Sequence, residues 1–181
     1  MQLIILDRDG VINEESRAYI KNPNEFIPIP GSLEAIAQLT AAGFKIAVAT
    51  NQAGVARKKF SLENLHAIHA HMQKLVNAHG GNIELICFCS HHPDEACHCR
   101  KPNVGMLEQI EQHFDIDLMK LKPRFAGDSY RDLVLGMRKG CIPTLVTTGD
   151  GQTTLTELTP ADKEKVEIFP NLAAVVKMML N

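Results

Sequence analysis

The sequence lacks several features that would mark a membrane, secreted or nucleic-acid-binding protein. No apolar run approaches the roughly 20 residues that span a bilayer, and the opening Met1–Leu6 stretch runs directly into charged Asp7 instead of continuing as a leader peptide. No basic tract is typical of a nucleic-acid interface, and no acidic tail is typical of disorder. We therefore expect a cytoplasmic protein with no membrane or nucleic-acid partner.

The composition is that of an ordinary globular chain. The 181 residues are 45% hydrophobic and 22% charged, with a formal net charge of −2. This length is enough to bury a substantial core, and we expect one domain over residues 1–181. No segment is expected to form a helix with a large apolar face, which favours a monomer.

Short apolar runs alternate with amphipathic segments. The expected strands are Leu3–Leu6, Lys45–Ala49, Leu85–Phe88, a short one ending at Phe125-Ala126, Thr144–Thr147 and Val166–Phe169. The expected helices are Ser32–Ala42, Ser61–His79, Val104–Phe114, Tyr130–Lys139 and Leu172–Leu180, with Ser32 and Ser61 as N-caps. Segments 13–31 and 149–165 are expected to be surface loops. This alternation indicates an α/β fold, a doubly wound parallel sheet with helices on both faces.

Polar side chains follow four of the expected strands. They are Asp7 and Asp9, then Thr50 and Asn51, then a Cys/His cluster leading to Lys101, and finally Asp128. Ligands of open parallel sheets bind beyond the carboxyl ends of the strands. The sequence therefore predicts a site at this edge of the sheet.

The residue types at this edge suit phosphoryl chemistry. Asp7 and Asp9 alone are equally consistent with a solvated turn, but Asp128 and Asp132 add further carboxylates at the same edge. Converging carboxylates repel one another unless a hard cation neutralises them, and Mg²⁺ prefers such ligands. Together with the cation of Lys101, magnesium and neutral donors describe a pocket for a phosphoryl group.

Four of the five cysteines lie within residues 87–99. The pattern C-x-H-x5-C-x-C at Cys89–Cys99 supplies three thiolates and an imidazole, a tetrahedral set suited to zinc. A closed set of four protein ligands indicates a structural zinc that folds a loop lacking its own core. The alternatives are a disulfide pair or free thiols.

Other reactive residue types have simpler interpretations. His66, His69, His71 and His79 fall on one expected helix without a carboxylate or cysteine beside them, and we expect a solvated helix face. Cys87 and Cys141 lie in or beside apolar strands and are expected to be buried hydrophobes. The run Arg57-Lys58-Lys59 is typical of a solvated loop, although Arg57 could also reach a substrate.

Four motifs in order resemble those of the haloacid dehalogenase superfamily. They are D-R-D-G at 7–10, T-N-Q-A-G at 50–54, R-K-P at 100–102 and G-D-S-Y-R-D at 127–132. The resemblance implies that Asp7 attacks phosphorus to form an aspartyl phosphate. It also implies that Asp9 acts as general acid and then general base.

The same resemblance assigns the remaining site residues. Magnesium would be held by Asp7, the backbone carbonyl of Asp9, and Asp128, while Thr50 and Lys101 stabilise the phosphoryl oxygens. Asp132 would orient Lys101 or a magnesium-bound water. Asn51, Gln52, Arg100 and Ser129 would contact the substrate. The zinc ligands would be Cys89, His91, Cys97 and Cys99, with His92 and His98 as substitutes.

Many members of the superfamily cover the site with an inserted cap domain. The intervals from Asp9 to Asn51 and from Thr50 to Lys101 are filled by the elements already expected, so we predict a capless enzyme that admits the end of a small phosphorylated metabolite.

The zinc loop before R-K-P resembles one branch of the superfamily, which contains the D-glycero-D-manno-heptose 1,7-bisphosphate 7-phosphatases and the histidinol-phosphatases. The segments T-N-Q-A-G-V-A-R-K-K-F and C-R-K-P-N-V-G-M resemble the heptose enzymes, which act in making the activated heptose of lipopolysaccharide. The short zinc-loop spacing is closer to the histidinol-phosphatases. A second phosphate on the substrate would need a cation such as Arg100. A non-catalytic zinc-binding interaction module is the alternative from another class.

Overall fold

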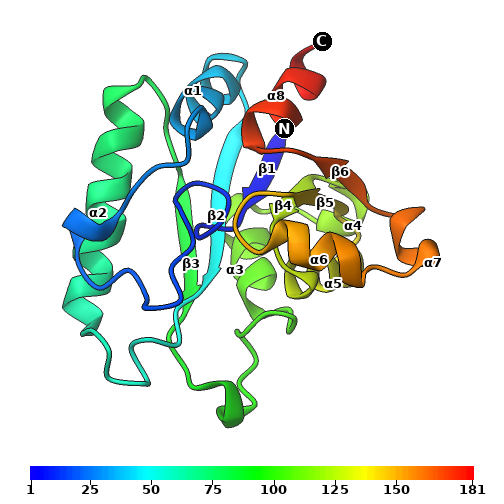
Figure 1. The fold of residues 1–181 in the computed structure, drawn as a ribbon. Helices are drawn as coiled ribbons and strands as arrows, with labels where there is room; N and C mark the ends of the chain where they lie inside the picture. The colour runs from blue at the N-terminus through cyan, green and yellow to red at the C-terminus, as the bar shows by residue number, and fades with distance from the viewer.

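The strand β1 (Leu3–Leu6) lies in the middle of a six-stranded parallel sheet in the computed structural model, which describes residues 1–181 (Figure 1). The other strands are β2 (Lys45–Asn51), β3 (Leu85–Cys89), β4 (Arg124–Gly127), β5 (Ile142–Val146) and β6 (Glu167–Phe169). Their order in the sheet is β3-β2-β1-β4-β5-β6, and all neighbours are parallel. The expected α/β fold with a doubly wound parallel sheet is confirmed.

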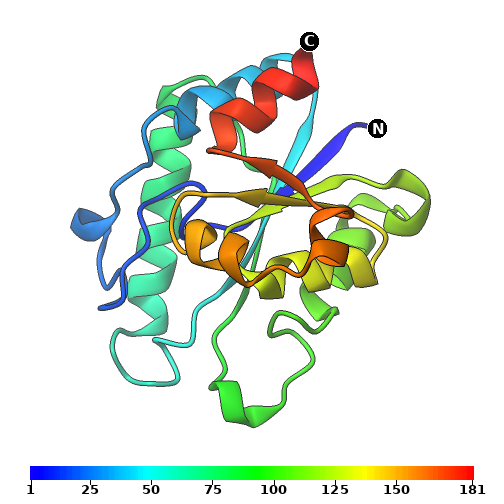
Figure 2. The ribbon, with the colours of Figure 1, turned by 45° about the vertical axis from the view of Figure 1, so that its right-hand side comes forward.

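Helices cover both faces of the sheet (Figures 1 and 2). The longer ones are α1 (Ser32–Ala41), α2 (Leu62–Ala78), α3 (Gly105–Phe114), α5 (Tyr130–Arg138) and α8 (Leu172–Leu180). Short helices are α4 (Leu118–Leu121), α6 (Gly151–Glu157) and α7 (Pro160–Lys163), with 3-10 turns η1 (Pro23–Glu25) and η2 (Pro93–Glu95). The helices α1, α2 and α8 pack on one face, and α3, α4 and α5 on the other.

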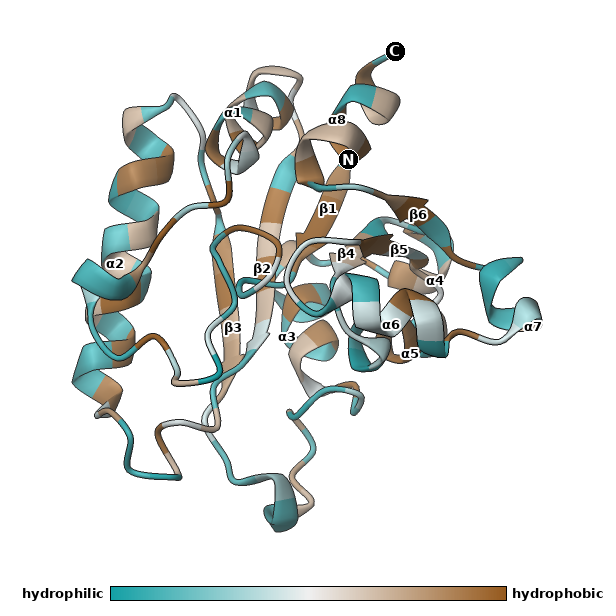
Figure 3. Cartoon of the chain, viewed as in Figure 1, coloured by the Kyte–Doolittle hydropathy of each residue, from teal (hydrophilic) through white to brown (hydrophobic).

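The all-apolar sequence of β1 follows from this two-sided burial. Ile4 and Leu6 join the core beneath α1, α2 and α8, while Leu3 and Ile5 join the core beneath α3 and α5. Figure 3 shows β1 in the brown of hydrophobic residues. A strand buried on both faces places no polar residue until it ends, so the first carboxylate, Asp7, stands at the sheet edge.

Some local expectations were wrong. Ser32 is not an N-cap: Gly31 occupies that position at φ +84°, and the buried Ser32 hydroxyl donates a hydrogen bond to the carbonyl of Val11. Segment 149–165 is not only loop, because it contains α6 and α7. Segment 13–31 lies over the core instead of being wholly superficial, since Ile20, Phe26 and Ile29 are buried.

The space around the sheet edge contains no cap domain. Between Asp9 and Asn51 lie only η1, α1 and β2, and between Asn51 and Lys101 only α2, β3 and η2. The site at this edge is therefore covered by its own loops, as expected for a capless member. None of the helices is both long enough and apolar enough to cross a membrane.

Candidate active site

The candidate site lies where the winding of the sheet reverses. The chain proceeds outward from β1 to β2 and β3, then returns to place β4 on the other side of β1. Asp7 and Asp128 follow β1 and β4, and the backbone N–H of Asp7 donates to the carbonyl of Ala126 on β4 (2.8 Å). A cavity of ≈560 Å³ opens above these strand ends. This switch point is where open α/β sheets bind ligands.

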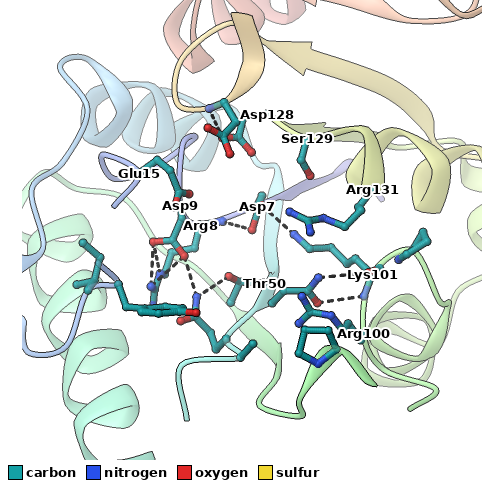
Figure 4. A pocket seen from close by; sticks show the side chains of 18 of the residues that line it. Asp7, Arg8, Asp9, Glu15, Thr50, Arg100, Lys101, Asp128, Ser129 and Arg131 are labelled. Carbon is teal, nitrogen blue, oxygen red and sulfur yellow. Dashed lines mark hydrogen bonds and ion pairs between the residues drawn. The ribbon is translucent and has the colours of Figure 1, made fainter. Parts of the chain in front are cut away.

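Lys101 connects the central carboxylates. Its buried ammonium lies 2.8 Å from Asp7 Oδ2 and 2.7 Å from Asp132 Oδ1, and it donates to the carbonyl of Ala49 (2.9 Å). The two carboxylates raise the pKa of Lys101 against the opposing effect of burial, so the side chain stays charged. Figure 4 shows Lys101 on one side of Asp7, with Arg8 and Asp9 on the other.

Three carboxylates converge beside this lysine. One oxygen each of Asp7, Asp128 and Asp132 lies within 4.8 Å of the other two, and all three residues are buried. Burial, together with the neighbouring carboxylates, raises the pKa of Asp7 to about 7 and that of Asp128 to about 8. Carboxylates that resist ionisation in this way need a cation to become fully charged, and an all-oxygen donor set fits Mg²⁺.

Gly10 explains why the D-R-D-G motif ends in glycine. Its φ is +78°, a conformation that favours glycine, and a Cβ there would lie 2.0 Å from Asp128 Oδ2. Any side chain at position 10 would displace the carboxylate of Asp128. The glycine of this motif therefore leaves room for Asp128, in addition to the role of the motif's own two aspartates.

Asp9 is held by a network of donors. Arg8 donates to both of its carboxylate oxygens at 2.9 Å, Asn13 donates to Oδ1 (2.9 Å), and Gln52 donates to Oδ2 (2.8 Å). Burial opposes the charge, but Arg8 and the hydrogen bonds from Asn13, Arg8 and Gln52 outweigh it and lower the pKa of Asp9. The orientation of this carboxylate is thus fixed from three directions.

The other predicted site residues lie around the same cavity, with different partners. Thr50 is buried and its hydroxyl accepts a hydrogen bond from Gln52 Nε2 (2.9 Å). The Asn51 side chain bonds both backbone groups of Lys101. Ser129 donates to Asp132 Oδ2 (2.6 Å) at the start of α5, which orients Asp132 toward Lys101.

Arginines gather at the rim of the cavity. Arg17, Arg57, Arg100 and Arg131 all line it, and Arg57 Nη1 donates to Tyr19 Oη (2.7 Å). Burial and the charges of Arg131 and Arg57 lower the pKa of Arg100, and its buried Nη1 has no hydrogen-bond partner. Guanidinium groups without a paired carboxylate attract anions, so this rim suits a negatively charged ligand. The contribution of Arg131 was missed from the sequence, although it lies within the G-D-S-Y-R-D motif.

The cysteine cluster brings its four predicted zinc ligands together, with all four ligand atoms within 4.8 Å of one another. Cys89 Sγ lies 3.6 Å from His91 Nδ1 and 3.5 Å from Cys97 Sγ, and Cys99 Sγ lies 3.2 Å from His91 Nδ1 and 3.7 Å from Cys97 Sγ. Zinc bonds of about 2.0–2.3 Å in a tetrahedron place neighbouring ligands about 3.4–3.8 Å apart. The four ligand atoms therefore fit one zinc ion. No disulfide joins these cysteines, so the alternative of a disulfide pair was wrong.

The two other histidines of the loop have different partners. His92 caps η2 and accepts from the backbone N–H of Asp94, while His98 Nε2 lies 2.6 Å from Glu108 Oε2. The choice of His91 from the resemblance agrees with this geometry. The loop adjoins the active site directly, since Arg100 and Lys101 follow Cys99.

The expectation of a solvated histidine face on α2 was wrong for His69. This side chain is buried at 7% exposure, and Arg8 Nη1 donates to its Nε2 (3.2 Å). His69 falls on the helix face that also carries Leu65 and Met72, both fully buried. That apolar spacing was the signal that could have placed His69 in the interior.

Burial of His69 predicts a pH-dependent stability. Burial, together with the charge of Arg8, lowers its pKa from 6.5 to about 3. Because the unfolded chain takes up this proton below pH 6.5 and the folded chain does not, stability falls as the pH is lowered. We expect His69→Gln to remove about 2 kcal/mol of the loss between pH 7 and pH 5. Urea unfolding of both proteins at the two pH values measures this, and equal losses would contradict it.

Comparison with known proteins places the chain among phosphatases. Residues 2–139 match the family model described as polynucleotide kinase 3 phosphatase. D-glycero-beta-D-manno-heptose-1,7-bisphosphate 7-phosphatase from Pseudomonas putida is 48% identical over 180 residues, covering 99% of this chain and 100% of the relative. The enzyme of the same name from Pseudomonas aeruginosa is 49% identical over 178 residues, covering 98% and 97%.

A solved structure shares the fold and the sequence. The crystal structure of D,D-heptose 1,7-bisphosphate phosphatase from Bordetella bronchiseptica, complexed with magnesium and phosphate, superposes with a TM-score of 0.93 and 45% identity. It covers 99% of this chain and 98% of its own.

Proposed function

The chain belongs to the D-glycero-β-D-manno-heptose 1,7-bisphosphate 7-phosphatases of the haloacid dehalogenase superfamily, and from this membership we propose that it removes the 7-phosphate of that sugar bisphosphate. The observation that supports this substrate best is the similarity to enzymes of that name over the whole of both chains. The product, a heptose 1-phosphate, is a precursor of the activated heptose used for lipopolysaccharide. All 181 residues would act as one phosphatase domain.

The proposed mechanism uses the two carboxylates of the loop that follows β1. Asp7 attacks phosphorus and the bond to the sugar oxygen breaks, which gives an aspartyl phosphate. Asp9, which its donors hold as a carboxylate in the free protein, has to enter this step protonated: it gives that proton to the departing alkoxide and then takes one from the water that hydrolyses the intermediate. Lys101, 2.8 Å from Asp7, lies where it can balance the charge of the phosphoryl oxygens. Thr50 and Asn51 add neutral donors at the same strand end.

The residues that would hold magnesium are Asp7, Asp128 and the backbone carbonyl of Asp9. Asp132 is not included because it forms a 2.7 Å ion pair with Lys101. When bound, the cation supplies charge neutralisation and an electrophilic contact for the phosphoryl oxygens. The zinc of the neighbouring loop is structural, because Cys89, His91, Cys97 and Cys99 leave no open position for water.

The arginines at the rim support a substrate with two phosphates. Arg100 carries a buried guanidinium nitrogen without a partner in the same cavity as Asp7. A phosphate at the far end of the sugar would accept from Arg100 and share the charge of Arg131 and Arg57. The ammonium group of histidinol phosphate would be repelled by this set. The relatives named above also support the heptose reading over histidinol-phosphatase.

The first experiment compares substrates. Phosphate release by the purified protein with Mg²⁺ is measured for the heptose 1,7-bisphosphate and for histidinol phosphate at equal concentration. We expect a strong preference for the bisphosphate and loss of only its 7-phosphate. A preference for histidinol phosphate would reverse the assignment. Absence of turnover with both, in protein that contains zinc and binds magnesium, would favour the non-catalytic module.

Removing the positive charge of Arg100 should weaken only the binding of the second phosphate of the substrate. Arg100→Ala is expected to lower kcat/KM for the bisphosphate by about 10- to 100-fold, mostly through KM, because a charge-assisted hydrogen bond contributes about 1.5–3 kcal/mol. The same substitution should leave the heptose 7-phosphate, which lacks the second phosphate, nearly unchanged. Arg124→Ala, at the opposite end of β4, is the control. An equal loss on both substrates would place Arg100 in the scissile-phosphate pocket instead.

A further inference from the structure

Arg8 is an unusual core residue. It is 1% exposed and ranks among the largest fully buried side chains, although it carries a permanent charge. Burying a guanidinium is costly unless its donors are satisfied and its charge is paired. Asp9 supplies the charge and accepts from Nε and Nη2 of Arg8. The remaining nitrogen, Nη1, faces away from this fork and needs an acceptor of its own.

That acceptor comes from a distant part of the chain. His69 Nε2, on α2 and 61 positions along the sequence, lies 3.2 Å from Arg8 Nη1. The His69 ring also contacts Phe88 on β3, with ring centroids 5.6 Å apart. The ring is therefore clamped between α2 and the sheet, and a rigid acceptor determines the direction in which Arg8 presents its other nitrogens.

We propose that His69 is a positioning residue for the general acid: a neutral imidazole that holds Arg8, which in turn holds the carboxylate of Asp9 at the angle needed to reach the leaving oxygen. This inference rests on the proposed function, in which Asp9 protonates the sugar alkoxide. The low pKa of His69, about 3, agrees with it, because a protonated ring could not accept from Arg8.

If His69 positions the general acid, the effect of removing it should depend on the leaving group of the substrate. An alkoxide leaves poorly without a proton, so the transfer of the phosphoryl group from a sugar to Asp7 depends on the position of Asp9. A nitrophenolate leaves without protonation, so p-nitrophenyl phosphate reports attack by Asp7 alone. Since kcat/KM includes only steps up to the first irreversible one, the comparison of kcat/KM isolates the acid step from later hydrolysis.

Three variants at α2 test the proposal. His69→Leu removes the acceptor and keeps an apolar side chain. His69→Gln restores an acceptor oxygen near the position of Nε2. His66→Leu, one turn away, removes an exposed histidine whose ring contacts the same Phe88 at 5.7 Å but has no bond to Arg8. Each is measured with the heptose bisphosphate and p-nitrophenyl phosphate, and Asp9→Asn provides the reference pattern for a missing acid.

We expect His69→Leu to lower kcat/KM for the sugar by about 10- to 100-fold and that for p-nitrophenyl phosphate by less than about threefold. His69→Gln should recover most of the sugar activity, and His66→Leu should match wild type. Equal losses on both substrates, or no loss, would overturn the proposal. If wild type itself does not hydrolyse the sugar, the proposed substrate fails, and another alkyl phosphate in its place still tests His69.

A structural measurement tests the proposal even if turnover of p-nitrophenyl phosphate is low or the leucine variant is unstable. In the crystal structure of His69→Leu, or of His69→Phe should the first not fold, we expect Arg8 to leave its two-oxygen contact with Asp9. An intact contact would overturn the proposal, whatever the rates.

Discussion

Replacing Asp7 with asparagine is expected to lower kcat for the heptose bisphosphate by at least about four orders of magnitude, the scale seen when a nucleophile is removed. The amide cannot form the acyl phosphate, and no neighbouring carboxylate can take its place. Asp128 is held by the backbone N–H of Asp150, and Asp132 is paired with Lys101. Asp9 is fixed by Arg8 on the other side of the pocket.

The same variant should remain folded and keep its zinc. Lys101 loses one partner but retains Asp132 at 2.7 Å and the carbonyl of Ala49 at 2.9 Å, so its charge is not left alone. Replacing Asp7, whose pKa is raised to about 7 by burial and the nearby carboxylates, also relieves repulsion within the cluster. The two effects oppose each other, and the midpoint of thermal unfolding should shift by only a few degrees.

Single-turnover assays and zinc analysis of Asp7→Asn measure these outcomes. Asp115→Asn is the matched control, because it makes the same chemical change at an exposed position in the left-handed conformation that asparagine accepts. Acid-quenched wild type should carry phosphate on the peptide that contains Asp7. Activity of Asp7→Asn within about tenfold of wild type would exclude the aspartyl-phosphate mechanism.

Loss of the zinc ligands should produce the second large effect. The double variant Cys97→Ser, Cys99→Ser is expected to bind no zinc, to lower the unfolding midpoint by about 10 °C, and to reduce kcat/KM at least about hundredfold. Between Ser90 and Cys99 no side chain is buried, so the metal replaces the core that this segment lacks. Without it, the loop loses the bonds that hold it together.

The activity is lost because the loop leads into Lys101. Cys97 accepts a hydrogen bond from Asn103 through its carbonyl, and His98 does so from the N–H of Gly105. These contacts and the Asn51 side chain fix the backbone that places the Lys101 ammonium between Asp7 and Asp132. A displacement of about 1 Å at such a group is enough to cost about two orders of magnitude in rate.

His98→Ala provides the comparison within the same loop. This histidine is exposed, pairs with Glu108 and lies outside the four-ligand set, so the variant should retain one zinc per chain and nearly full activity. Hydrogen exchange should show that loss of protection in the double cysteine variant is confined to residues near 89–105. A double variant that keeps wild-type activity would separate the zinc loop from catalysis.

Much of the fold could be predicted from the sequence because its main elements have strong local signals. A four-residue apolar run such as Leu3–Leu6 is typical of a strand buried on both faces, and Ser61 before α2 is a true N-cap. The order of polar residues after successive strands also predicted which side chains share an edge. Parallel strands bring their ends together, so Asp7, Lys101 and Asp128 meet as expected.

The predictions that were wrong or missing depended mostly on tertiary contacts. The segment that forms α6 and α7 is rich in Gly and Thr, which have low helix propensity, and α6 is stabilised by packing beside β5. The short helix α7 buries no residue and is held by the capping box of Thr159 and Asp162. His69 was misassigned by residue type, although its spacing with Leu65 and Met72 indicates the buried face of α2; only its hydrogen bond to the buried Arg8 required the fold. Arg8 itself was passed over in D-R-D-G, since only the folded loop shows that its charge is enclosed.

The position of β1 in the sheet has a consequence for synthesis of the chain. This strand is made first, yet its neighbour β4 emerges only after β2, β3 and the zinc loop. Until then a ribosome-bound chain holds β1 with one edge unpaired, and that edge belongs to a wholly apolar strand. Open apolar edges recruit other strands. Nascent chains stalled before residue 124 should therefore be the stage most prone to aggregation and most dependent on chaperones.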